Sequence, residues 1–491
     1  MYARPSRKKE LARRTFTYVL MTVTSLLLVA MLMMMVLGYR FNFETQTVEQ
    51  TGLVQYNSFP RGARVSVDGK LGERTQTKAS ILPGQRQFAM HLTGYETWQK
   101  TVDIAPGTVT WLSYVRLVPT EKVITSIQDI DRLSSAVASP DDRYIAGTAT
   151  DEAGAITFVL MDMRNSQQPT VAQYPIDTTK LAGFAEERPA TDHRLSVVRW
   201  SDSSRAVVLK HQYTLSDRGE QTDWLWIDRE QPGVVHNLSS LLNLAISSVI
   251  PIDGKGVYIL QSNGDVRQAA VDTGTISRPL LSQVTWFDVY SDETIAYIGK
   301  LDQERVAGVW QRGWQESTVL MSVPEANMQQ MHIQVSEYFN KDTAVVSLGP
   351  SVTVYRGAIP ATDDGLAAFL QTATTFTLNR PITHLQVSQN GRFVMAEDTT
   401  GFISYDIERQ LASQGVKKRS TSPLRWLDGY HIWDIDATGQ LVMEEYDGVN
   451  SYSLMPVSAG YDTLLTSDGR YIYGFLKEGE TVKLQRLAMT L

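Results

Sequence analysis

The residue types that carry most enzyme chemistry are sparse in this sequence, and they are not arranged in known catalytic patterns. No two of the seven histidines stand at the i, i+4 spacing of metal ligands on a helix (His91, His193, His211, His236, His332, His384 and His431). The chain has no GxSxG elbow, no P-loop and no GxGxxG fingerprint. The only S-x-x-K match, Ser6 to Lys9, lies in a basic N-terminal tail. The sequence therefore assigns no catalytic, cofactor-binding or metal-binding residue, and predicts no cofactor.

One segment matches the spacing of a calcium-binding loop. Asp434, Asp436, Thr438 and Gly439 are followed by Glu445 at the twelfth position. Oxygen ligands at alternate positions can surround a hard cation. The flanking residues, however, are typical of strands rather than of the two helices of an EF-hand, and Asp-Ala-Thr-Gly is a common hairpin turn. Whether Asp434–Glu445 binds calcium stays open, and we favour the turn.

Most of the tryptophans lie in the C-terminal three quarters of the chain, where their indole rings could stack on sugar or peptide. Eight of the ten tryptophans lie beyond residue 120 (Trp200, Trp224, Trp226, Trp286, Trp310, Trp314, Trp426 and Trp433). The alternative is that these large side chains pack between repeated structural units, which we favour.

Composition excludes several classes of protein. The 491 residues are 43% hydrophobic and 20% charged, which is typical of folded globular chains. Cysteine is absent, which excludes disulfides, zinc–thiolate sites and thiol catalysis. Residues 1–39 hold six basic residues and one acidic residue, and the remaining chain holds 40 basic and 52 acidic residues, a net charge of −12. A region with this negative net charge repels nucleic acid, so we expect no nucleic-acid partner.

The charged N-terminus leads into an apolar run that is long enough to cross a membrane. Phe16–Leu37 contains no charge, proline or glycine, and as a helix its 22 residues would span about 33 Å. A cleaved signal peptide is the alternative, but the run is longer than the usual apolar region and Val36-Leu37-Gly38 is a poor cleavage site. We expect residues 16–38 to be a permanent single-pass anchor in the lipid bilayer. Residues 1–15 would be cytoplasmic by the positive-inside rule, with the body outside the cell membrane.

After a polar connector at residues 39–51, residues 52–119 alternate short strand-like runs with turn signals such as Asp68-Gly69 and Pro83-Gly84. This pattern predicts a small β-sandwich. Its motifs resemble the PEGA domain: Pro60-Arg-Gly-Ala63, then Val65-Ser-Val-Asp-Gly-Lys70, Leu82-Pro-Gly84 and Gly94-Tyr95. The family's Glu is replaced by Arg61. The resemblance implies a module of bacterial or archaeal surface proteins without known catalytic residues, with a binding or spacer role.

Residues 120–491 repeat a polar turn followed by an alternating strand, as in Ser139-Pro-Asp-Asp-Arg-Tyr-Ile-Ala-Gly147. Eight Asp or Asn anchors recur about every 47 residues, the size of a four-stranded propeller blade (Asp141, Asp202, Asp253, Asp292, Asp342, Asn390, Asp428 and Asp468). The region resembles WD40-like propellers with an SPDGRYIA signature, although the Gly-His and Trp-Asp signatures are missing. We expect eight blades, or seven if one weak copy is false.

Two further expectations concern the ends and the loops of this region. The last repeat lacks an outer strand, and residues 121–128 precede the first repeat without a blade of their own. We predict that they pair with the final repeat, because a closed sheet has no exposed edge. Asp363–Leu370 looks like a short helix on a loop.

The fold class is therefore mainly β: a transmembrane helix, a PEGA-like sandwich and a seven- or eight-bladed β-propeller. We expect a non-enzymatic cell-envelope protein that binds or scaffolds an unidentified envelope protein or glycan. The alternatives are a propeller enzyme that acts on glycan or peptide, and a receptor-like sensor with a short cytoplasmic tail. Clustered carboxylates at the channel mouth would favour the enzyme, and a broad aromatic face would favour partner binding. Oligomeric state and the propeller face in use stay open.

Overall fold

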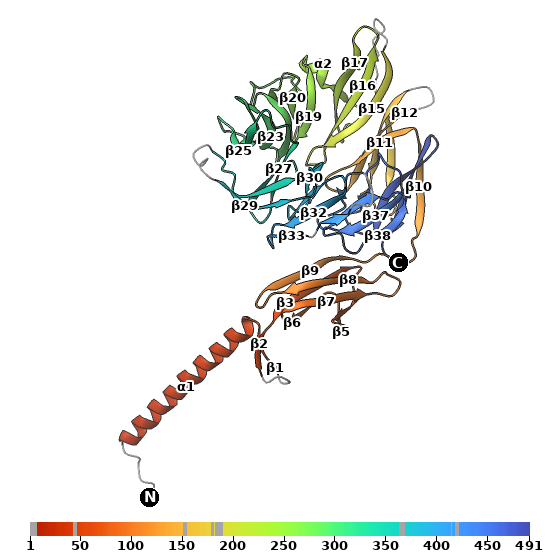
Figure 1. Cartoon of the computed structure of the whole chain (residues 1–491). Coiled ribbons are helices and arrows are strands. Elements are labelled where there is room, and N and C mark those ends of the chain that lie inside the picture. The colour runs from red at the N-terminus through yellow and green to blue at the C-terminus, as the bar shows by residue number, and fades with distance from the viewer. Residues whose placement is uncertain are drawn as a thin grey trace. The chain divides into compact units, whose positions relative to one another are not determined.

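The computed structural model in Figure 1 describes residues 7–42, 47–150, 155–177, 181, 190–362, 369–413, 415–417 and 422–491. The chain divides into two compact units, residues 1–121 and 122–491. The predicted helix at Asp363–Leu370 lies almost wholly outside the described residues.

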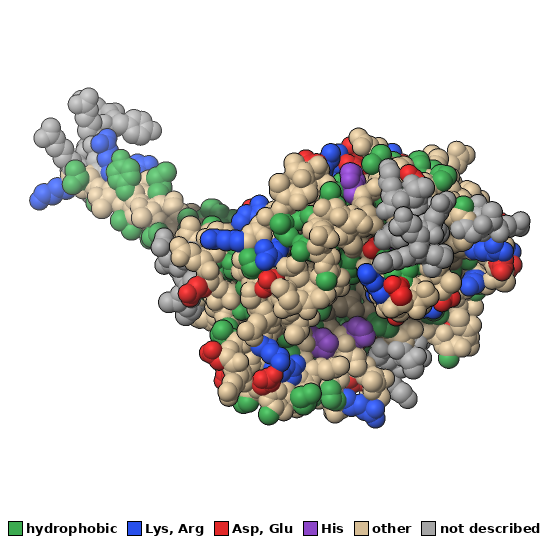
Figure 2. All heavy atoms as spheres, turned by 90° about the horizontal axis from the view of Figure 1, so that it is seen from above, with side chains coloured by type: hydrophobic (Ala, Val, Ile, Leu, Met, Phe, Trp, Pro, Cys, Tyr) green, Lys and Arg blue, Asp and Glu red, His purple; other side chains and the backbone are tan. Residues whose placement is uncertain are grey.

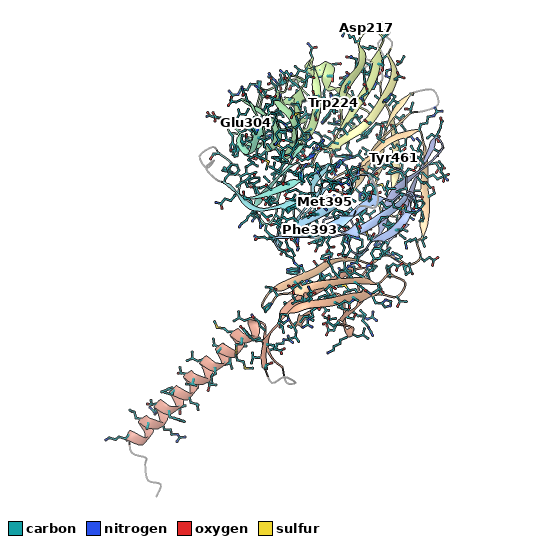
Figure 3. The ribbon with its side chains drawn as sticks, viewed as in Figure 1. Asp217, Trp224, Glu304, Phe393, Met395 and Tyr461 are labelled. Carbon is teal, nitrogen blue, oxygen red and sulfur yellow. The ribbon has the colours of Figure 1, made fainter. Side chains whose placement is uncertain are left out.

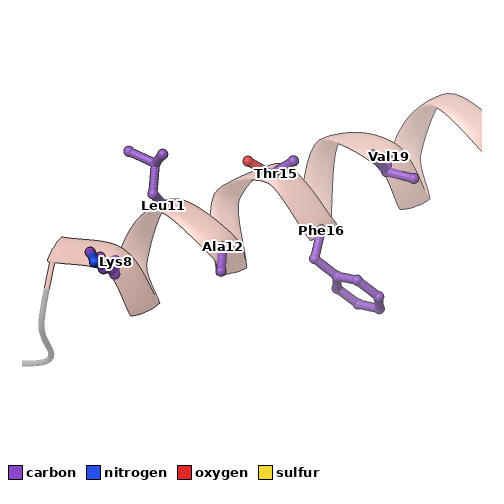
Figure 4. A pocket seen from close by; sticks show the side chains of 6 residues that line it. All are labelled: Lys8, Leu11, Ala12, Thr15, Phe16 and Val19. Carbon is purple, nitrogen blue, oxygen red and sulfur yellow. The ribbon is translucent and has the colours of Figure 1, made fainter.

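The apolar N-terminal run forms the long helix α1, Arg7–Val36. Its segment Leu11–Met35 has a mean hydropathy of 2.2 and is the one helix among the described residues that is long and apolar enough to span a membrane. No part of this window is buried within the protein, and its apolar side chains are visible in Figure 2. The stripe of Leu11, Thr15 and Val19 in Figure 4 shows one such uncovered face. The helix starts nine residues before the predicted span because Arg, Lys, Glu, Leu and Ala are good helix formers.

The connector after α1 is an antiparallel hairpin of β1 (Tyr39–Asn42) and β2 (Thr47–Gln50), in which Tyr39 pairs with Gln50. Its strands were not foreseen from the sequence, because the segment is short and polar and shows no clear alternation.

The first unit continues as a sandwich of two sheets, ordered β6-β3-β9 and β5-β4-β7-β8. The strands are β3 (Gly52–Phe59), β4 (Arg64–Val67), β5 (Lys70–Arg74), β6 (Thr77–Ile81), β7 (Gly84–His91), β8 (Trp98–Ile104) and β9 (Val109–Arg116). Asp68 and Gly69 both have positive φ and join β4 to β5, as their sequence predicts. Tyr56, Phe88 and Trp98 fill a single core between the sheets.

The described residues of the second unit form eight antiparallel sheets. The first four contain β11 (Leu133–Ala138), β12 (Tyr144–Thr150), β13 (Ile156–Asp162) and β14 (Thr170–Pro175); β15 (Ala190–Trp200), β16 (Ala206–Leu215), β17 (Gly219–Asp228) and β18 (Val235–Asn237); β19 (Ile246–Ile252), β20 (Gly256–Gln261) and β21 (Val266–Ala270); and β22 (Val284–Tyr290), β23 (Thr294–Leu301), β24 (Glu304–Gln311) and β25 (Thr318–Pro324). A short helix, α2 (Leu238–Leu242), follows β18.

The next three sheets contain β26 (Met331–Glu337), β27 (Asp342–Leu348), β28 (Ser351–Gly357) and β29 (Leu370–Thr377); β30 (His384–Val387), β31 (Phe393–Glu397), β32 (Gly401–Asp406), β33 (Leu411–Ala412) and β34 (Val416–Lys417); and β35 (Arg425–Trp426), β36 (His431–Ile435), β37 (Gln440–Glu445) and β38 (Tyr452–Pro456). The eighth has the order β10-β41-β40-β39, from β10 (Ile124–Asp131), β39 (Leu464–Leu465), β40 (Tyr471–Glu478) and β41 (Thr481–Ala488). These successive meanders are the architecture of a β-propeller.

The eight repeat anchors all lie where the first strand of a sheet turns into the second. In four sheets the anchor's side-chain oxygen accepts the backbone N–H two residues on: Asp141 from Arg143, Asn390 from Arg392, Asp428 from Tyr430 and Asp468 from Arg470, at 2.8–3.2 Å. The Ser or Thr two residues before Asp141, Asn390 and Asp468 donates its hydroxyl to that anchor at 2.6–2.7 Å. The repeat signature is thus a side-chain-stabilised turn, which explains why Asp or Asn recurs there.

The predicted pairing of the segment before the first repeat with the last sheet is confirmed. Strand β10 pairs with β41 from Ile124 opposite Leu487 to Asp131 opposite Thr481. The same sheet also meets the first one, because the Tyr461 hydroxyl donates to the Leu133 carbonyl at 2.8 Å and the Asp462 N–H donates to the Ala136 carbonyl at 2.9 Å. Chain segments more than 300 residues apart therefore join in the ring.

Candidate functional site: the channel mouth

The first strands of several sheets converge at their C-terminal ends around one cavity, which we call the mouth cavity. Its volume is about 430 Å³, and it is lined by residues of β15, β22, β26 and the turns after β15 and β30, among them Arg199, Asp202, Asp288, Tyr290, Glu337 and Gln389. These residues come from four of the eight sheets, so the cavity lies at the centre of the propeller, on the side of the repeat-anchor turns.

One polar contact at the cavity joins sheets that are not neighbours, and a second joins consecutive sheets. Arg199 Nη1 on β15 lies 2.5 Å from Asp288 Oδ1 on β22, and this ion pair bypasses the β19–β21 sheet. The Tyr290 hydroxyl donates to Glu337 Oε2 at 3.3 Å. Arg199 is the single cation among the lining residues, against three carboxylates (Asp202, Asp288 and Glu337). The lining therefore has a formal charge of −2.

Two carboxyl groups around the mouth cavity have raised pKa values, because they are buried and lie near other carboxylates. The pKa of Asp142 is raised to about 7, mainly by burial and also by the nearby carboxylates of Asp141 and Asp428, while a hydrogen bond with Gln389 opposes the rise. Burial also raises the pKa of Asp202, with added repulsion from Asp292, Asp288 and Asp253 and a partial offset from Arg199. A cation placed in the mouth would relieve this repulsion.

The wall of the cavity also contains a hydroxyl that lacks a partner. Ser336 lines the cavity and is 7% exposed, and its Oγ makes no hydrogen bond within the described part of the chain. Thr343, its cross-strand neighbour on β27, is fully buried and its hydroxyl is equally unpartnered among those residues. Buried hydroxyls normally find a hydrogen-bond partner. Of the two, only Ser336 lines the cavity, so its hydroxyl leaves hydrogen-bonding capacity in the wall.

The tryptophans do not form a stacking platform. Six of the eight are buried (Trp200, Trp224, Trp226, Trp310, Trp314 and Trp433), and Trp286 is 38% exposed. Trp224, labelled in Figure 3, donates its indole N–H to the Ile246 carbonyl of the next sheet at 3.0 Å. These contacts support packing between sheets as their role.

Strand pairing brings two histidines together that are 18 residues apart in the sequence. His193 Nδ1 lies 3.1 Å from His211 Nε2, and their rings are stacked at an interplanar angle of 6°. His211 is fully buried, and its Nδ1 lies 4.0 Å from Asp223 Oδ2. Burial lowers the pKa of His193, and His211 lowers it further. Among the described residues no three His, Asp or Glu side chains are grouped closely enough to hold a metal ion.

The calcium-loop match is spread along a hairpin. Asp436 Oδ1 accepts the backbone N–H groups of Thr438 and Gln440 at 2.8 and 3.0 Å, which builds the turn between β36 and β37. Asp434 pairs with Val442, whereas Glu445 lies three positions further along the ladder, opposite His431. The side chains that the pattern requires around one ion are thus separated along two strands.

The mouth cavity was not predicted from the sequence, although one signal pointed to it. Eight acidic or amide anchors in the same turn of a repeat must lie on one face of a propeller. The residues that line its centre, such as Arg199, Asp288 and Glu337, lie on the first strands and belong to no motif.

Comparisons with known proteins identify one part of the chain. Residues 51–120 match the model of the PEGA domain. No curated protein matches the chain. Among solved structures it is similar to the dihydro-heme d1 dehydrogenase NirN in complex with DHE, at 11% identity and a TM-score of 0.42 over 66% of each chain. It is also similar to an oligogalacturonate lyase in complex with manganese, at 10% identity and a TM-score of 0.38 over 74% of this chain and 98% of the lyase. These values say nothing about the activity of this chain.

Proposed function

We propose that this protein is a non-enzymatic cell-envelope protein that one helix anchors in the membrane and that presents its PEGA domain and propeller outside the cytoplasm. The observation that carries the proposal is α1, whose apolar window Leu11–Met35 is uncovered by any part of the protein. Leaving so much apolar surface in water is costly, and a bilayer removes that cost. The basic residues that precede the apolar run Phe16–Leu37 support a cytoplasmic N-terminus.

Because the chain has no cysteine, single cysteines can report its topology. Ser467→Cys places a thiol at an exposed position of the last propeller sheet, and Ser6→Cys places one before the helix. In intact cells, a membrane-impermeant maleimide should label Ser467→Cys, and it should label Ser6→Cys only after lysis. The reverse pattern would overturn the orientation. Release of the protein by alkaline carbonate, with a mature N-terminus beyond Gly38, would overturn the anchor.

We further propose that the mouth cavity is the part of the propeller that binds, and that it takes a cationic group. Support comes from the charge of the lining, the raised carboxylate pKa values and the unpartnered hydroxyl of Ser336. The partner is then an envelope protein or glycan that offers an ammonium or guanidinium group.

A fluorescent oligolysine peptide tests this assignment on the detergent-solubilised full chain. The double variant Asp202→Asn, Glu337→Gln should weaken its binding by about tenfold, because removal of two charges from a partly desolvated site costs about 1.4 kcal/mol or more. The matched control is Asp217→Asn, an exposed carboxylate at the tip of the β16–β17 hairpin (Figure 3). Equal binding of the peptide by the unmodified protein, the double variant and the Asp217→Asn control would show that the mouth cavity is not the binding site. This result would leave the anchor proposal intact.

A propeller enzyme is the second candidate, and the carboxylates at the mouth are the observation that favours it. Asp202, with its raised pKa, would be the general acid, and Glu337 would be the second carboxylate. Turnover of a glycan or peptide substrate that Asp202→Asn abolishes while the protein stays folded would establish this candidate and overturn the non-enzymatic proposal.

A further inference from the structure

The junction between α1 and the PEGA domain is fixed by hydrogen bonds. Gln50 Nε2 donates to the Leu37 carbonyl at 3.0 Å, and the Thr51 N–H and hydroxyl donate to the Gly38 carbonyl at 2.8 and 2.9 Å. Gly38 has φ +82°, and a Cβ there would lie 2.7 Å from the Thr51 carbonyl oxygen, so this close approach requires glycine. These bonds satisfy carbonyls at the helix end that would otherwise lack partners.

A further backbone hydrogen bond connects this junction to the sandwich. The Thr51 carbonyl accepts the Gly107 N–H at 3.1 Å, and Thr51 is followed at once by β3. The helix end is therefore tied both to the first strand of the sandwich and to the loop between β8 and β9. No flexible linker separates the apolar helix from the domain.

Apolar side chains are exposed at the end of the sandwich from which α1 leaves. Gly52 pairs with Ile81 and Leu53 pairs with Val109, so Leu82 and Val109 lie at this end. Leu82 is 40% exposed and Val109 49% exposed.

The β1–β2 hairpin adds two more exposed apolar side chains directly after the helix. Tyr39 is 38% exposed and Val48 58% exposed. Arg40 lies opposite Glu49 in the ladder, so this pair adds no net charge. Tyr39 follows the apolar window by four residues, which places it within about 14 Å of the end of that window. Tyrosine is enriched at this depth of a bilayer.

We propose that this end of the PEGA domain, with Leu82 and Val109, rests on the outer surface of the lipid bilayer together with Tyr39 and Val48 of the β1–β2 hairpin. The inference depends on the proposed anchor and extends it, because a single span alone would leave the domain free to swing. The lipid surface is the occupant because α1, which is continuous with this surface, already ends in the bilayer. The contact then holds the PEGA domain in one orientation on the bilayer.

Single-cysteine variants in the full chain test the contact. Leu82→Cys and Val109→Cys place an environment-sensitive fluorophore at the proposed contact. Thr93→Cys is the matched control, exposed in the β7–β8 connection at the opposite end of the same domain. The proteins are reconstituted in phosphatidylcholine vesicles with and without headgroup-labelled quencher lipid. Quenching should be about threefold or more stronger at positions 82 and 109 than at position 93.

Equal quenching at all three positions would overturn the inference, and so would fluorophore self-quenching at position 82 that depends on protein density, because a second copy would then cover the surface. Flotation of the same vesicles separates the two proposals. Protein that floats with the vesicles without differential quenching retains the anchor and loses the surface contact. Protein that does not float refutes the anchor itself. If Leu82→Cys or Val109→Cys fails to fold, quenching of a fluorophore at Val48→Cys tests the membrane contact independently.

Discussion

The two β regions of this molecule hold their strands together in different ways. In the sandwich, Tyr56, Phe88 and Trp98 belong to one core formed by a segment of about 65 residues. In the propeller, the apolar residues form separate clusters between neighbouring sheets, such as that of Phe158 with Val207. The cluster around Ile130 and Tyr473 is the exception, because it unites the two ends of the propeller chain. The sandwich therefore depends on local packing, and the propeller depends on one long-range closure.

The largest expected effect is in the sandwich. Trp98 is fully buried in its single core, so Trp98→Ala should cost this domain about 3–5 kcal/mol. Scanning calorimetry of the detergent-solubilised full chain should show a lower or absent sandwich transition and an unchanged propeller transition. A parallel loss of both transitions would show that the two regions unfold as one unit.

Ile130→Ala tests the closure of the propeller. Ile130 is fully buried on β10 and pairs with Val482 of the last strand. We expect a loss of about 2–4 kcal/mol that affects the propeller transition alone. Protease cleavage should then increase first between residues 122 and 132, because β10 detaches as an edge strand. Ile124→Ala, at a 40% exposed position of the same strand, is the control and should have a small effect. Equal effects of both variants would contradict a closure that depends on buried contacts.

The repeat-anchor turns should contribute less. Asp468 Oδ1 accepts the Arg470 N–H and the Thr466 hydroxyl, so Asp468→Ala should cost the propeller about 1–2 kcal/mol in urea unfolding. Asp468→Asn keeps an acceptor and should recover most of that loss. If Asn and Ala are equally destabilising, the charge rather than the turn hydrogen bonds explains the recurrence of Asp.

The smallest effect is a pH dependence confined to the propeller. The pKa of Asp142 is raised to about 7 in the fold, above its unfolded value of 3.8, so the fold favours the protonated form. This contribution is complete below pH 3.8 and is lost as the pH rises through about 7. Asp142→Asn should therefore stabilise the propeller at pH 8, by on the order of 1 kcal/mol, and change little at pH 4. A constant difference between pH 4 and pH 8 would exclude this titration.

Much of the fold could be predicted because its signals are local. The apolar run after the basic tail, the Asp68-Gly69 turn and the recurring anchors each act within a few residues. The closure by residues 121–128 also followed from the sequence, because an incomplete last repeat and an unassigned first strand complement each other. The β1–β2 hairpin was missed, because its pairing is stabilised by contacts with the helix end rather than by a pattern of its own.

The sequence by itself determined the long apolar helix, the alternation of strands and turns and the acidic net charge, since these depend on residue type and spacing along the chain. Only the tertiary structure decided which side chains meet. It buried six of the eight tryptophans of the propeller, stacked His193 on His211 and brought Arg199 to Asp288 across the mouth cavity. The physical reason is that such contacts join side chains on different strands, and which side chains meet depends on strand register and on how the sheets pack.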